Sequence, residues 1–166
     1  NWVNKEHIKL LPPDDVADKV CKIINNYYSS DILFVKKLLP VIMGRINSFG
    51  EIINLIEAGE LIYFFEKPDY EAGFLKWKGD SGIETTKIHL TRALSILENI
   101  PDEQFTIDNI RRVLFGYAEE KGKGSVLWPI RYALSGRDRS PDPLMLMAIL
   151  GKKESVERLD IALKKI

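Results

Sequence analysis

A short corner, residues 127–143 (LWPIRYALSGRDRSPDP), combines arginines, which suit phosphate, with a serine and prolines between two apolar segments. Arginine donates hydrogen bonds in a fork that matches phosphate oxygens. A serine hydroxyl both donates and accepts, and proline fixes the backbone torsions around it. The residues concerned are Arg131, Arg137, Arg139, Ser140, Pro141 and Pro143.

The charge distribution along the chain points to the same end. Residues 121–166 contain ten Lys or Arg and five Asp or Glu, whereas the whole chain contains 24 of each class. A basic end on a neutral chain is a feature of phosphate-binding surfaces. The alternative is a basic face that is simply solvated, and charge alone favours that alternative.

The composition bounds the class of protein. The chain has 166 residues, of which 45% are hydrophobic and 29% are charged, so a packed core is expected and global disorder is not. The single cysteine, Cys21, excludes an internal disulfide and fits a reducing, cytoplasmic compartment. Cys21, His7 and His89 lack the spacing of zinc ligands. No apolar run approaches the roughly 20 residues of a membrane span.

Catalytic patterns are not found in the sequence. The stretch EKGKGS at residues 120–125 has glycines and lysines, but not the spacing of a phosphate-binding loop. No serine lies in a nucleophile elbow. Glu119 and Glu120 form an acidic pair of the kind that is usually solvated. We therefore expect this chain alone to be inactive and to hold no metal or cofactor.

Helical periodicity runs through almost the whole sequence and predicts an all-α fold. Caps are expected from Ser48 with Glu51, Ser81 with Glu84, Thr106 and Ser125. Pro40 is expected to kink or split its helix. The predicted helices cover residues 14–28, 31–44, 48–59, 81–100, 106–122, 125–136, 144–150 and 153–166.

Two further features concern the organisation of the chain. Residues 60–70 (ELIYFFEKPDY) are the one plausible strand, although a buried helix end fits the same short apolar run. Residues 76–82 (KWKGDSG) are rich in glycine and charge and read as a boundary. The predicted architecture is a bundle or cage of two helical subdomains, residues 1–80 and 81–166.

The stretch LWPIRYALSGRDRSPDPLMLMAILGKKESVERLDIAL resembles the carboxyl-terminal end of bacterial glutamyl-tRNA synthetases. In that family a Pro-(Leu/Ile)-Arg-x-Ala-Leu-(Ser/Thr)-Gly helix leads through a short loop to an apolar helix ending in Leu-Gly-Lys. Upstream, FTIDNIRRVLFGYAEEKG resembles the preceding helix. WVNKEHIKLLPPDDVA resembles the family's Trp-x-Asn-x-x-(Tyr/His)-Ile junction. The resemblance spans the whole chain and is strongest for residues 105–166.

The resemblance implies the anticodon-binding part of such an enzyme, a helical cage. The two family signatures for ATP do not occur in this sequence, so ATP and Mg²⁺ are expected to act in the full-length enzyme and not in this chain. The implied partner is tRNA(Glu), with no DNA or membrane partner and a monomeric state. A helical regulatory or protein-interaction domain that reuses the fold is the alternative; a stand-alone enzyme is the least favoured reading.

The resemblance also assigns residues to the anticodon pocket. The positions of Ser140, Pro141 and Pro143 line that pocket in the family. A stiff loop suits this role, because little entropy is lost when an unstacked base docks. Asp142 and Pro143 stand where small or apolar residues are usual. The alternative is a helix–loop–helix corner in which the prolines only interrupt the helical structure.

Arg45, in PVIMGRINSFGEI, resembles the family's arginine that reads the last anticodon base. Arginine only donates, so it can satisfy the O2 and N3 acceptors of an unpaired cytosine. Guanine presents N1–H and N2–H₂ donors on the same edge and would be rejected. Glutamate anticodons end in C and glutamine anticodons in G. The alternative is an exposed arginine that finishes a helix.

A wider set of cations is expected to contact or attract tRNA phosphates, which positions RNA without specifying sequence. For Arg131 an internal salt bridge is the alternative. Three aromatic side chains, Trp77, Trp128 and Tyr132, could stack on bases, although core positions fit their helical spacing equally. The predicted phosphate contacts are Arg131, Arg137, Arg139, Lys121 and Lys123.

Overall fold

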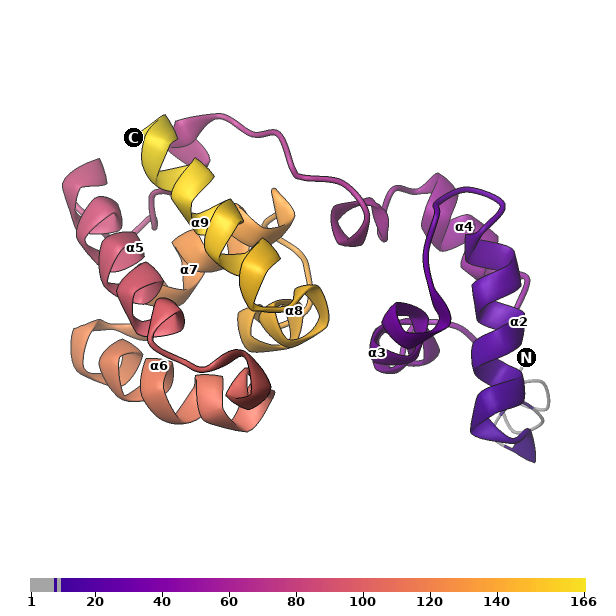
Figure 1. The fold of residues 1–166 in the computed structure, drawn as a ribbon. Helices are drawn as coiled ribbons and strands as arrows, with labels where there is room; N and C mark the ends of the chain where they lie inside the picture. The colour runs from indigo at the N-terminus through magenta and orange to yellow at the C-terminus, as the bar shows by residue number, and fades with distance from the viewer. Residues whose placement is uncertain (1–7, 9) are drawn as a thin grey trace. The chain divides into compact units, whose positions relative to one another are not determined.

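The computed structural model describes residue 8 and residues 10–166, and within them it contains helices and turns without a strand (Figure 1). The all-α prediction is confirmed. The chain forms two compact units, residues 1–65 and residues 66–166. The predicted junction at residues 2–17 lies partly outside the described residues. Within the described part, no helix has the length and apolarity needed to cross a membrane.

The first unit is built on α2 (Pro13–Ile24), α3 (Ile32–Met43) and α4 (Glu51–Glu57). Pro13 occupies the first turn of α2, where the missing N–H costs nothing. Val16, Val20 and Ile24 form the buried face of α2, as the spacing predicts. α2 contacts both α3 and α4, so this unit has an apolar core of its own.

Pro40 does not split α3, which continues to Met43. The proline lies on the exposed side of the helix, where water can hydrate the carbonyl that its ring leaves without a helical partner. Residues 60–70 contain a short 3₁₀ turn, η1 (Ile62–Phe64), and no strand. The consecutive residues Tyr63 and Phe64 are both buried, which an alternating strand would not allow.

The second unit surrounds α7 (Lys123–Ser135), which contacts each of the other long helices of the unit. Val126, Ile130 and Leu134 of α7 are fully buried. In Figure 1 the colour of this unit runs from magenta, just after residue 65, to yellow at α9 and the carboxyl end. The remaining elements are η2 (Ala72–Leu75), α5 (Ile83–Glu98), η3 (Asp102–Gln104), α6 (Ile107–Lys121), α8 (Pro143–Leu150) and α9 (Lys152–Lys165).

The helix caps agree with the sequence in part. Thr106 caps α6, because its hydroxyl accepts from the Asn109 N–H at 3.4 Å. At the start of α4, the carboxylate of Glu51 accepts from the Asn47 N–H at 2.9 Å, so the predicted reciprocal pair with Ser48 is not formed.

Ser81 and Ser125 do not cap helices. α5 follows Gly82 without a side-chain cap, because the chain is extended at that glycine and turns into the helix one residue later than predicted. α7 already begins at Lys123. Ser125 therefore lies inside the first turn of α7, and its hydroxyl donates to Asp80 Oδ1 at 2.5 Å.

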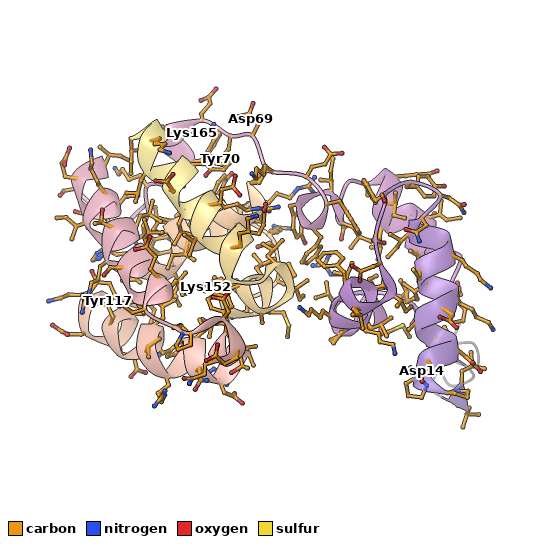
Figure 2. All side chains as sticks on the ribbon, in the orientation of Figure 1. Asp14, Asp69, Tyr70, Tyr117, Lys152 and Lys165 are labelled. Atoms are coloured by element: carbon orange, nitrogen blue, oxygen red, sulfur yellow. The ribbon has the colours of Figure 1, made fainter. Side chains whose placement is uncertain are left out.

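Residues 66–80 are part of the second unit. The indole Nε1 of Trp128 donates to the Phe74 carbonyl at 3.0 Å. The ammonium of Lys165, on α9, donates to Asp69 Oδ1 at 3.0 Å and to the Tyr70 carbonyl at 2.9 Å (Figure 2). The compact units therefore divide after residue 65, earlier than the sequence boundary at residues 76–82. The division into functional subdomains 1–80 and 81–166 stays a prediction.

Candidate nucleic-acid interface

The corner between α7 and α8 begins at Gly136, which has a left-handed backbone (φ 66°). Its N–H donates to the Tyr132 carbonyl at 2.7 Å and so completes the last turn of α7. A Cβ at this position would lie 2.7 Å from the Cβ of Pro68. Glycine is therefore required both by the backbone torsion and by the close approach of residues 68–70.

Arg158, on α9, fixes the end of α7 from inside the unit. It is 3% exposed, and its guanidinium donates to the Leu134 carbonyl at 2.5 Å and to the Glu66 carbonyl at 3.2 Å. Its Nε donates to Glu154 Oε1 at 2.7 Å. A cation at a helix carboxyl end is favourable, because it meets carbonyls that have no helical partner.

Ser135 shapes the first step of the corner. Its hydroxyl donates to the Arg131 carbonyl at 2.8 Å and accepts from the Arg137 N–H at 3.2 Å. The buried hydroxyl thus turns the backbone at Arg137 away from the helix axis. Arg158 and Ser135 were not singled out in the sequence. The one local sign of Arg158 is its i,i+4 spacing from Glu154 on an otherwise apolar face.

The predicted pocket residues take different positions in this corner. Ser140 and Pro141 are half-buried, and the Ser140 hydroxyl donates to the Pro141 carbonyl at 3.2 Å. Asp142 is exposed and caps α8 by accepting from the Leu144 N–H at 2.9 Å. Pro143 is buried as the first residue of α8. Pro143 therefore packs beneath the loop surface and supports the loop. The pocket role of Ser140, Pro141 and Pro143 stays a prediction.

The predicted phosphate-contacting residues fall into two groups. Arg131 and Arg137 are half-buried and Arg139 is exposed, all at the carboxyl end of α7. The Nε of Arg131 is buried without a hydrogen-bond partner, and no ion pair joins Arg131 to another described residue, so the internal salt bridge is not formed. These three arginines lie on or beside a single helix end.

The two lysines lie near the opposite, amino end of α7: Lys121 is the last residue of α6, and Lys123 is the first residue of α7. Lys121 pairs with Glu120 at 2.8 Å, and this contact raises the pKa of the lysine. Lys123 pairs with Glu119 at 3.2 Å and lies over the ring of Phe115. At about 1.5 Å per residue, Lys123 is roughly 20 Å from Arg137 along the axis of α7. The five cations therefore do not form one patch.

The three aromatic residues considered for stacking on bases pack on one another. The ring centroids of Trp77 and Trp128 are 5.4 Å apart, and those of Trp128 and Tyr132 are 5.6 Å apart. A Cβ on Gly124 would lie 2.5 Å from Trp77, so the indole lies directly against the first turn of α7. The structure thus favours the core alternative for these rings.

Arg45 lies in the first unit, directly after α3. Its N–H donates to the Ile42 carbonyl at 2.9 Å, and its side chain reaches outward. Nη1 donates to Glu60 Oε2 at 3.1 Å. Sequence reasoning missed Glu60, because the partners are separated by α4. Among the described residues there is no group of three or more His, Cys, Asp or Glu side chains that could hold a metal ion.

Known proteins resemble this chain over nearly its whole length. It is 29% identical to the glutamate–tRNA ligase of Clostridium acetobutylicum over 169 residues, covering 99% of this chain and 33% of that protein. It is 31% identical to the corresponding ligase of Lachnoclostridium phytofermentans over 175 residues, with the same coverage. The chain thus spans about a third of the length of these relatives.

Solved structures support the fold. A glutamate tRNA ligase from Elizabethkingia meningosepticum, crystallised with its amino acid, superposes with a TM-score of 0.75 at 21% identity. The superposition covers 98% of this chain and 31% of that one. At this identity the likeness concerns the fold alone. Residues 15–163 also match the family model described as an anticodon binding domain, and the chain therefore belongs to the anticodon-binding domain family.

Proposed function

We propose that this chain recognises the anticodon loop of a glutamate tRNA, as the anticodon-binding part of a glutamate–tRNA ligase. The observation that carries the proposal is the family match over residues 15–163, together with relatives of that name aligned to 99% of the chain. In the full-length enzyme, ATP and Mg²⁺ would serve the attachment of glutamate outside this chain. We expect a cytoplasmic monomer with no DNA or membrane partner.

Two parts of the chain are proposed to read bases. The corner at residues 136–143 offers backbone groups and the Ser140 hydroxyl on a loop that Gly136 and Asp142 hold in one conformation. Such a preorganised loop loses little entropy when an unstacked base docks. Arg45, in the first unit, would donate to the last anticodon base.

Backbone contacts are proposed mainly for the arginines at the end of α7. Arg137 and Arg139 follow the left-handed Gly136 and have no ion pair with another described residue, so their charges are available to phosphate. Lys121 and Lys123 are weaker candidates, since carboxylates already partner them. For Arg131, one buried guanidinium nitrogen lacks a partner, and a phosphate oxygen on its exposed side would add the missing charge compensation.

Electrophoretic mobility shift with unmodified tRNA transcripts tests the proposal. We expect retention of a glutamate tRNA in preference to an unrelated tRNA of equal length, with affinity that falls as salt rises. Equal retention of both tRNAs, or none, would contradict the proposal and favour a helical protein-interaction domain. The matched control is a glutamate tRNA whose anticodon loop has been replaced, because its phosphate charge is unchanged.

A further inference from the structure

Arg45 and Glu60 are held side by side by the ends of two helices. α3 ends just before Arg45, and the next residue, Ile46, is buried. α4 ends in a left-handed turn at Gly59 (φ 68°), where the Glu60 N–H donates back to the Leu55 carbonyl at 2.9 Å. Leu61 then enters the core. Because the neighbouring residues Ile46 and Leu61 are buried, the backbone positions of Arg45 and Glu60 are fixed.

The contact leaves both side chains open to a ligand. Arg45 Nη1 and Glu60 Oε2 are 3.1 Å apart, and the side chains are 29% and 45% exposed. The contact uses one nitrogen of the guanidinium and one oxygen of the carboxylate. Further N–H donors of Arg45 and a carboxylate acceptor of Glu60 are therefore left for a ligand.

We infer that Glu60 is a second specificity-determining residue, which accepts a hydrogen bond from the exocyclic amine of the base read by Arg45. This inference rests on the proposed function. Cytosine presents acceptor O2, acceptor N3 and donor N4–H₂, which complement the two donors of Arg45 and the acceptor of Glu60. Arg45 and Glu60 together thus offer the same hydrogen-bonding groups as the pairing edge of guanine.

The other bases fit this pair less well. Uracil has a carbonyl, O4, where cytosine has its amine, and this carbonyl would face the Glu60 carboxylate. Guanine would place N–H donors against the donors of Arg45. Arg45 alone rejects guanine and opposes the N3–H of uracil, but it does not contact the group at position 4 of the ring. Glu60 therefore adds a second point of discrimination between the two pyrimidines, at N4 of cytosine and O4 of uracil.

The test combines a change in the base with a change in the protein. The RNA probe is the anticodon stem-loop of a glutamate tRNA with cytosine, guanine or 2-pyrimidinone as the third anticodon base. 2-Pyrimidinone is cytosine without its exocyclic amine. We expect the wild-type chain to bind the 2-pyrimidinone RNA about ten-fold more weakly than the cytosine RNA. Glu60→Ala should reduce this ratio to about one.

Glu57→Gln is the matched control for loss of negative charge, because Glu57 is exposed on α4 of the same unit. It should keep the ten-fold ratio, even if removal of a charge strengthens binding to every RNA. Thermal unfolding of Glu60→Ala verifies that the first unit still folds. Loss of the ratio in both variants would attribute the effect to net charge and contradict the inference.

The two proposals fail in different ways. If the wild-type chain does not prefer the cytosine RNA over the guanine RNA, the proposed function of Arg45 is wrong. If it prefers cytosine over guanine yet binds the 2-pyrimidinone RNA equally well, only the inference about Glu60 is wrong. Retention of the ten-fold ratio in Glu60→Ala would likewise show that another group contacts the amine.

Discussion

A single side chain, Arg45, is proposed to choose between two anticodons. Arg45→Gln replaces a group that only donates with an amide that can donate or accept. We expect weaker binding of a C-ending anticodon and stronger binding of a G-ending one, so that discrimination falls about ten-fold, as for a contact of roughly 1–3 kcal/mol. Both tRNAs are measured by mobility shift at fixed salt.

Arg137→Ala provides the comparison for Arg45→Gln. A phosphate contact carries no sequence information, so this variant should weaken both tRNAs equally. An equal loss for both tRNAs in Arg45→Gln as well would place Arg45 among the phosphate-binding or structural arginines. The discrimination assigned to it would then have to come from elsewhere.

Arg158 is a buried cation whose removal is expected to lower the stability of the second unit. Arg158→Met keeps much of the side-chain volume but leaves the carbonyls of Leu134 and Glu66 without their donor. We expect the free energy of unfolding to fall by about 2–4 kcal/mol. Urea denaturation at pH 7 measures it. Lys164→Met, which removes an exposed cation of the same helix, should change stability by less than about 0.5 kcal/mol.

His89 makes stability depend on pH. Its Nδ1 lies 2.7 Å from the Tyr117 hydroxyl, and burial lowers its pKa, while Asp80 raises it and Lys121 lowers it. The unfolded chain therefore binds the proton more readily. The free energy of unfolding should fall as pH drops below about 6.5, by no more than about 1.4 kcal/mol per pH unit.

Comparison of the wild-type chain with His89→Gln isolates this contribution. Urea denaturation at pH 7.5 and pH 5.5 should show a smaller loss for the variant. Carboxyls such as Asp14 and Asp69, whose pKa values are lowered by Lys36 and Lys165, titrate below this window and should affect both proteins alike. Identical losses in the two proteins would exclude His89 as the titrating group.

At the scale of elements, the end of α7 depends on a glycine. Gly136→Ala introduces a Cβ at positive φ and 2.7 Å from Pro68, so we expect a loss of about 1–3 kcal/mol in the free energy of unfolding. Gly116→Ala, inside α6 with open space around it, should instead stabilise by up to about 1 kcal/mol. Thermal denaturation of both variants tests the contrast.

Local signals predicted most of the helices and failed where partners are distant. The prolines at α2, Thr106 at α6 and Gly136 at α7 act through their own backbone torsions or near neighbours, so the sequence reveals them. Ser125 instead bonds to Asp80, a partner 45 residues away. Its interaction depends on how η2 and α5 pack on α7, which no local pattern records.

The candidate site shows the same division between local and distant information. Ser140, Pro141 and Arg45 could be proposed from family resemblance, and the structure places them on or beside turns. Glu60 and Arg158 could not, because each becomes informative only beside a partner in another element. Pro143 is buried because α8 begins there, one residue before the predicted start at Leu144.

At the scale of the whole molecule, residues 66–80 are part of the folded second unit. Phe74 stacks on Tyr132 with centroids 5.5 Å apart, and Lys165 binds the Tyr70 carbonyl. A fragment of residues 66–166 should therefore unfold cooperatively, whereas residues 81–166 should unfold at a lower temperature with exposed aromatic rings. Circular dichroism melts compare them. Equal midpoints would show that residues 66–80 contribute nothing to this unit.

The bonds of α9 to the start of the second unit also set an order of events during protein synthesis. Glu66 meets Arg158 and Asp69 meets Lys165 across 92 and 96 residues of chain. The first unit has its partners within 65 residues, so it can fold while translation continues. The second unit cannot close until α9 has left the ribosome. Until then, the apolar faces of α5 and α7 that α9 covers are the surface that a chaperone would meet.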